Sequence, residues 1–113
     1  MGFKIGLAEK RKERLERELN RLVPEIIRLG VEKIILFGSL SSNEIHKASD
    51  IDLVVVQKTK KRFLERLDEF YNYLKPNVAV DIFVYTPEEF NGMKDRNSFI
   101  KYALNKGRII YEK

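Results

Sequence analysis

Two aspartates interrupt an otherwise apolar segment, Ser49-Asp50-Ile51-Asp52-Leu53-Val54-Val55-Val56, and this pattern limits how the chain can fold. The β-branched residues indicate a buried strand over residues 51–56. Side chains alternate along a strand, so Asp50 and Asp52 are expected on one side with Cα atoms about 7 Å apart. Converging carboxylates repel each other unless a cation lies between them, and Mg²⁺ takes oxygen ligands of this kind. The alternative is a turn-forming Asp50 followed by an exposed strand position.

A second candidate feature is the pair Gly38-Ser39, which follows the apolar run 34–37. A glycine lets the backbone approach an anion closely, and Ser39 adds a hydroxyl donor, so a strand that turns into a helix here could hold a phosphate. Taken alone, most such pairs are simply turns. The third feature is Asp81, which interrupts the apolar segment 78–84. A carboxylate there is costly unless it is paired or binds metal, or unless it faces water on an edge strand.

The chain begins with a predicted amphipathic helix at about residues 6–29, with Gly30 as its stop. Pro24 either kinks this helix or begins a new one. The apolar residues form one stripe, which is either a core face or a heptad-like surface for a partner: Leu15, Leu19, Leu22, Ile26 and Leu29.

The remaining pattern predicts strands at 33–37, 51–56, 78–85 and 109–111. Helices are predicted at 60–74, from 87 and at 97–105, with one or two helical turns within 40–48. This order indicates a single α/β (α+β) domain over residues 1–113, with helices flanking a sheet of about four strands. A mixed sheet is expected because the third strand follows a short break at Pro76-Asn77.

The composition limits the classes of protein to which this chain can belong. The 113 residues contain no cysteine, which excludes disulfides, cysteine-based zinc sites and a thiol nucleophile. The lack of cysteine fits a reducing cytosol, and no segment is long and apolar enough for a membrane span or a signal peptide, so a cytoplasmic location is expected. The net charge of +5 suits an anionic substrate. General nucleic-acid binding is not favoured, because no aromatic residues are interleaved with a basic motif.

Together these residues resemble the nucleotidyltransferase superfamily that includes DNA polymerase β, and within it the minimal nucleotidyltransferase (MNT) branch. The family pattern is Gly-Ser, ten residues, Asp-x-Asp and a later carboxylate on a neighbouring strand. This chain has Gly38-Ser39, ten residues, Asp50-Ile51-Asp52, and then Asp81. Its ending, residues 99–111, also resembles the terminal helix and strand of the family. The resemblance therefore covers nearly the whole chain and implies the nucleotidyltransferase fold.

The resemblance also implies roles. Gly38 and Ser39 match the turn that binds the β- and γ-phosphates, Asp50 and Asp52 match ligands of two Mg²⁺ ions, and Asp81 matches the carboxylate that ligates the second ion. The chain departs from the family after Gly-Ser, because Leu40-Ser41-Ser42-Asn43 replaces the common Arg-Ala-Arg-Gly. Two arginines that would neutralise triphosphate are therefore missing. The basic residues that could replace them are Lys47, as a candidate nucleotide-binding residue, and His46, which as a lone histidine is more typical of a solvated loop.

Members of this branch are typically encoded beside a helical HEPN-domain protein as a toxin–antitoxin pair. The resemblance implies Mg²⁺-dependent transfer of AMP from ATP to a hydroxyl of such a partner. The alternative is an interaction module with a vestigial site that neutralises the partner by binding. A transferase acting on small molecules or nucleic acid is least favoured, because such enzymes usually carry an extra helical domain.

Overall fold

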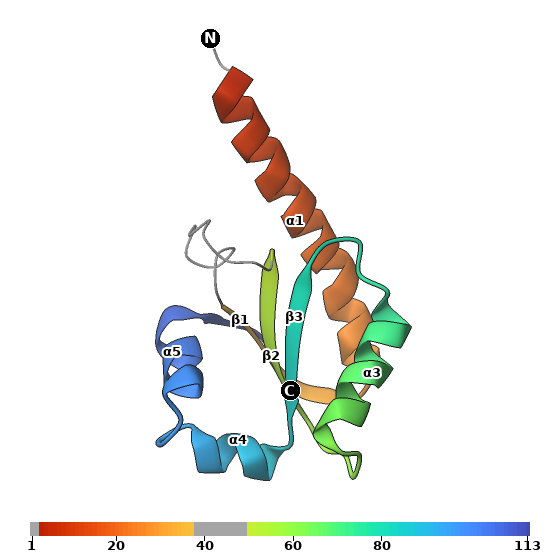
Figure 1. Cartoon of the computed structure of the whole chain (residues 1–113), viewed down its shortest axis with the longest axis vertical. Helices are drawn as coiled ribbons and strands as arrows, with labels where there is room; N and C mark the ends of the chain where they lie inside the picture. Colours follow the sequence, from red (N-terminus) through yellow and green to blue (C-terminus); the bar gives the residue numbers. More distant parts are fainter. Residues whose placement is uncertain (1–2, 38–49) are drawn as a thin grey trace.

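The computed structural model describes residues 3–37 and 50–113. One sheet separates two layers of helices, and α1 projects well beyond the sheet (Figure 1). The described elements, in chain order, are α1 (Phe3–Arg28), β1 (Val31–Phe37), β2 (Ile51–Gln57), α3 (Phe63–Leu74), β3 (Val80–Tyr85), α4 (Pro87–Met93), α5 (Ser98–Lys106) and β4 (Arg108–Glu112). No helix in these ranges is long and apolar enough to span a membrane.

The sheet has the strand order β3-β2-β1-β4. Strands β2 and β3 are parallel, whereas β1 pairs antiparallel with both β2 and β4. The predicted α/β single sheet of four mixed strands is therefore confirmed, but the reason given for its mixed character is wrong. The strand after the Pro76-Asn77 break is the parallel one, because α3 returns the chain to the starting end of the sheet.

One face of the sheet packs against α1 and α3. The predicted stripe of α1 faces inward: Leu15, Leu19, Leu22 and Ile26 are buried, and Leu29 is partly buried against the core. The interpretation of this stripe as a core face is confirmed. The helix continues through Pro24, and Gly30 follows its end with a φ of 82°, a conformation that glycine adopts without steric cost.

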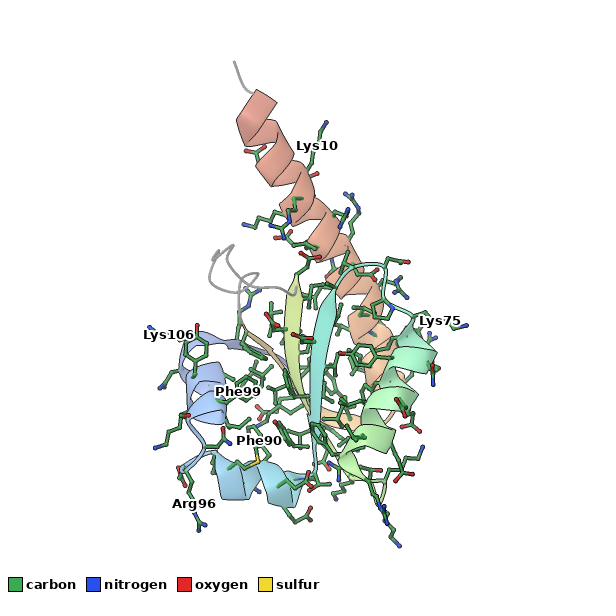
Figure 2. All side chains as sticks on the ribbon, viewed as in Figure 1. Lys10, Lys75, Phe90, Arg96, Phe99 and Lys106 are labelled. Carbon is green, nitrogen blue, oxygen red and sulfur yellow. The ribbon has the colours of Figure 1, made fainter. Side chains whose placement is uncertain are left out.

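The other face packs against α4 and α5. Phe90 of α4 and Phe99 of α5 point toward the sheet, whereas Lys106 at the end of α5 points outward (Figure 2). Thr86 caps α4 by accepting a hydrogen bond from the backbone N–H of Glu89 at 3.2 Å. Gly107 ends α5 with a φ of −89°, a value that other residues also adopt. A Cβ atom here would lie 2.4 Å from the carbonyl oxygen of Ala103 in α5 and 2.6 Å from that of Leu36 in β1, so the close approach of both elements requires glycine.

Candidate active site

The sheet places two of the predicted aspartates side by side. Asp52 is the register partner of Phe37 on one side and of Asp81 on the other, so the three side chains form a row across β1, β2 and β3 on the face covered by α5. Asp52 is 4% exposed, whereas Asp81 lies on the edge strand and is exposed. The row therefore runs from a buried carboxylate to one that solvent and a large substrate can reach.

Asp81 occupies an edge-strand position that faces water, which is the alternative to metal binding that the sequence left open. Exposure removes most of the cost of a carboxylate in an apolar segment. Its neighbour still distinguishes it from an ordinary surface residue. A second carboxylate lies directly opposite on β2, and like charges opposite each other in a sheet are unfavourable unless a cation compensates them.

Asp50 immediately precedes β2 and is bound from two directions. Its Oδ1 accepts a hydrogen bond from Nη2 of Arg11 at 2.6 Å, and this contact is also an ion pair. Its Oδ2 accepts a longer bond of 3.4 Å from the backbone N–H of Ala79. The backbone N–H of Asp50 donates in turn to the carbonyl oxygen of Ala79 at 2.8 Å. The start of β2 is thus tied to the segment that enters β3 and to α1.

The predicted phosphate-binding residues Gly38, Ser39 and Lys47 lie outside the described residues, as does His46. Their predicted roles remain predictions. The structure fixes one end of their segment, because Phe37 ends β1 directly opposite Asp52. The chain therefore leaves β1 at the row of carboxylates.

Three aromatic rings, one of them that of Phe37 in this row, pack together on the same face of the sheet. Phe99 of α5 packs edge-on against Phe37 at a centroid distance of 5.2 Å and against Phe83 at 5.0 Å. Phe83 follows Asp81 by two residues on β3, and its partner on β2 is Val54. An apolar floor beneath Asp52 excludes water on that side, which strengthens the interaction of a carboxylate with any cation bound above it.

Tyr71 of α3 holds the edge strand on both sides of Asp81. Its hydroxyl donates to the carbonyl oxygen of Val80 at 2.8 Å and accepts from the backbone N–H of Ile82 at 3.0 Å. Burial raises the pKa of Tyr71, and the negative charges of Asp81 and Asp52 raise it further. The hydroxyl therefore stays protonated and can make both bonds, which fix the backbone at Asp81.

A buried carboxylate on α1 holds the loop that leads into β3. Glu18 is 6% exposed and binds Arg21 through two bonds of 2.8 and 2.9 Å. It also accepts bonds from the backbone N–H and the side-chain amide of Asn77. The hydrogen bonds from Arg21, together with those from Asn77, lower the pKa of Glu18 to about 2. Glu18 therefore anchors the loop before β3 as an anion at neutral pH.

Sequence reasoning missed the supporting roles of Arg11, Tyr71 and Glu18. Arg11 and Glu18 belong to a run dense in both charges, in which no local signal distinguishes a residue that reaches another element. The ring of Tyr71 is partly buried against the core, as the apolar pattern of its helix would suggest, and that pattern does not indicate the two hydrogen bonds of its hydroxyl. The only signal in the sequence was the length of the first helix. A helix longer than the strands extends past the sheet and can contact the loops at that end of the sheet.

The donor types suit the Mg²⁺ that the sequence predicts, because carboxylate oxygens are its preferred protein ligands. Within residues 3–37 and 50–113, however, no three carboxylate or imidazole groups are gathered closely enough to enclose a metal ion. Asp50 is held by Arg11, whose guanidinium occupies this carboxylate as a cation would. The residues therefore fit a metal if Asp50 exchanges that partner, and Asp52 and Asp81 are already adjacent.

The comparisons with known proteins agree with this architecture. A crystal structure of a putative nucleotidyltransferase from Sulfolobus solfataricus has a similar fold, with a TM-score of 0.65 and 21% identity; the alignment covers 94% of this chain and 87% of that one. A protein of Methanocaldococcus jannaschii named "Putative protein adenylyltransferase" is 33% identical over 81 residues, which cover 72% of this chain and 79% of that protein. The family model described as "Nucleotidyltransferase domain" matches residues 12–111, and the chain belongs to this family of nucleotidyltransferases.

Proposed function

We propose that this nucleotidyltransferase transfers AMP from ATP, with Mg²⁺, to a hydroxyl group of a partner protein. The observation that carries the proposal is the pairing of Asp52 with Asp81 on adjacent parallel strands, with Asp50 two residues before Asp52. The name of the Methanocaldococcus jannaschii relative supports the choice of adenylyl transfer and of a protein acceptor.

In the proposed reaction the acceptor hydroxyl oxygen forms a bond to the α-phosphorus of ATP while the bond from that phosphorus to pyrophosphate breaks. The hydroxyl proton passes to a carboxylate of the site or to solvent. Asp50, Asp52 and Asp81 would hold two Mg²⁺ ions, which lower the pKa of the attacking hydroxyl and stabilise the leaving pyrophosphate when bound. Gly38 and Ser39 would bind the β- and γ-phosphates, with Lys47 as an additional cation.

The unequal exposure of the two paired carboxylates supports a large acceptor. Asp52 is only 4% exposed and therefore offers little surface to a large molecule. Asp81 lies on the outer strand, where a side chain of another protein can approach. An acceptor hydroxyl would therefore enter from the β3 edge, and Asp81 would position it or take its proton.

For the partner we propose a helical protein of the HEPN class, with this chain as the antitoxin of a toxin–antitoxin pair. This choice follows from the resemblance to minimal nucleotidyltransferases. Recognition of the acceptor would then be a contact between the partner and the described strands and helices, which surround one sheet.

The test is transfer of label from [α-³²P]ATP and Mg²⁺ to the protein co-expressed from the adjacent gene. We expect the wild-type chain to label it and both Asp52→Asn and Asp81→Asn to reduce labelling by at least about 100-fold, the scale on which loss of a preorganised charge group lowers a rate. The matched control is Asp68→Asn, which removes an exposed carboxylate on α3 and should label normally. Equal labelling by wild type and Asp52→Asn would refute the proposal.

The alternative is a module that neutralises its partner by binding alone. The engagement of Asp50 by Arg11, and the lack of a closed three-ligand cluster in the described ranges, favour it. A calorimetric titration with ATP and Mg²⁺ separates the two functions. Binding by the wild-type chain that Asp52→Asn abolishes supports the transferase, and no heat of binding supports the module.

A further inference from the structure

Arg11 connects the projecting part of α1 to the candidate active site. It lies 39 residues before Asp50 in the sequence, and its guanidinium contacts Oδ1 of Asp50 at 2.6 Å. The Arg11 side chain is 49% exposed and that of Asp50 is 21% exposed. Figure 1 shows that this part of α1 extends past the end of the sheet where β2 begins. The extension of the helix is what allows Arg11 to reach the site.

The surroundings distinguish Arg11 from the other arginines of its helix. Arg14 and Arg17 line a groove of about 340 Å³ between α1 and residues 77–78, and neither forms an ion pair with the described residues. Arg21 is fully engaged by Glu18 and by the carbonyl oxygens at the end of α3. Arg11 is thus the arginine of α1 that binds a predicted metal ligand.

A single, half-exposed ion pair of this kind is easily exchanged. Such pairs contribute between almost nothing and about 1 kcal/mol. A divalent ion carries twice the charge of the guanidinium and is held by several carboxylates at once, so it would displace Arg11 from Asp50. A displaced guanidinium beside the site would then face nucleotide phosphate, whose oxygens it can bind in a bidentate manner.

We propose that Arg11 is an exchangeable counter-cation of the active site, which neutralises Asp50 while metal is absent and binds a phosphate of the nucleotide once metal occupies Asp50. This proposal rests on the proposed function, because it takes Asp50 as a metal ligand. Arg11 would thereby provide a positive charge near the triphosphate. The segment after Gly38-Ser39 lacks the arginines common in the family, because it reads Leu40-Ser41-Ser42-Asn43.

The test compares wild type, Arg11→Gln and the control Arg14→Gln by calorimetry, with Mn²⁺ as the probe ion. Without nucleotide, Arg11→Gln should bind Mn²⁺ about twofold to fivefold more tightly, because the ion no longer competes with the guanidinium. With saturating Mn²⁺, the same variant should bind ATP about threefold to tenfold more weakly, as expected for the loss of one charged hydrogen-bond donor. Arg14→Gln removes an equal charge one turn away and should change both affinities by less than about twofold.

Each outcome decides a separate point. Equal Mn²⁺ affinity in wild type and Arg11→Gln would overturn the exchange at Asp50, and unchanged ATP affinity in Arg11→Gln would overturn the phosphate contact. Equal effects of Arg11→Gln and Arg14→Gln would show a general effect of charge and would also overturn the proposal. If no variant bound Mn²⁺ while all remained folded by circular dichroism, the proposed metal site itself would be refuted.

Discussion

Two of the arginine–carboxylate pairs of helix α1, Arg21–Glu18 and Arg11–Asp50, differ in burial and in the number of hydrogen bonds that the carboxylate accepts. Glu18 is buried and accepts four hydrogen bonds from Arg21 and Asn77. Asp50 is partly exposed and shares a single short bond with Arg11. Both pairs tie α1 to the region where β2 and β3 begin, but one saturates its carboxylate and the other leaves oxygen lone pairs available.

The comparison separates an anion that is suited to holding the structure from one that is suited to the proposed metal site. A saturated, buried carboxylate cannot take a new ligand without breaking several bonds, so Glu18 is suited to fixing the loop before β3. Asp50 accepts one short bond from Arg11 and one long bond from the backbone of Ala79, and solvent reaches it, so it can exchange Arg11 at little cost, which suits a metal ligand. The same residue types on one helix therefore serve different purposes because their burial differs.

The largest effect is expected from Glu18→Gln. The glutamine keeps the shape of the side chain but loses its charge, so the bonds to Arg21 and Asn77 weaken and the free energy of unfolding should fall by about 1–3 kcal/mol. Denaturant unfolding followed by circular dichroism measures it. Glu16→Gln alters an exposed neighbour on the same helix and should change stability by less than about 0.5 kcal/mol. Equal losses of stability in the two variants would show that Glu18 does not have the structural role proposed for it.

The pH dependence of the free energy of unfolding should also show the contribution of Glu18. The pKa of Glu18 falls from 4.5 to about 2 on folding, so its contribution is complete above pH 4.5 and is lost as the pH falls toward 2. Wild type should therefore lose more stability than Glu18→Gln over this interval. Unfolding curves at successive pH values test the difference, and parallel profiles for the two proteins would contradict the assignment.

A smaller effect is expected from Tyr71→Phe. This change removes the hydroxyl that bonds Val80 and Ile82 on either side of Asp81, and water at the sheet edge can replace it only in part. The free energy of unfolding should fall by about 1 kcal/mol. Hydrogen exchange of the Ile82 amide provides a local measurement. Faster exchange at Ile82, with other β3 amides unchanged, is the expected result, and unaltered exchange would show that Tyr71 does not fix the strand.

The smallest effect on stability is expected from Arg11→Gln. The loss of one half-exposed ion pair should lower the free energy of unfolding by no more than about 0.5 kcal/mol, several times less than Glu18→Gln. The same denaturant series measures it. A loss as large as that of Glu18→Gln would mean that the Arg11–Asp50 pair is structural, and the contrast between the two pairs would fail.

The fold could largely be predicted from sequence because its signals are local. Hydrophobic periodicity located the strands and helices, and the break at Pro76-Asn77 located the start of β3. Strand direction and register depend on contacts distant in the sequence, so the sequence did not show that Asp52 would pair with Asp81 or that β2 and β3 would be parallel. The partner of Asp50 could not be predicted either, because Arg11 is one of 22 basic residues and only the tertiary structure selects it.

The most direct test of the central claim, that Asp50, Asp52 and Asp81 bind a divalent ion, is paramagnetic broadening by Mn²⁺ in the NMR spectrum of the ¹⁵N-labelled chain. The ion should broaden first the amides at the starts of β2 and β3, residues 50–53 and 79–82, and Asp52→Asn should abolish the effect. Broadening of these amides by substoichiometric Mn²⁺ is the predicted result. Broadening confined to other residues, or identical broadening in Asp52→Asn, would contradict the account.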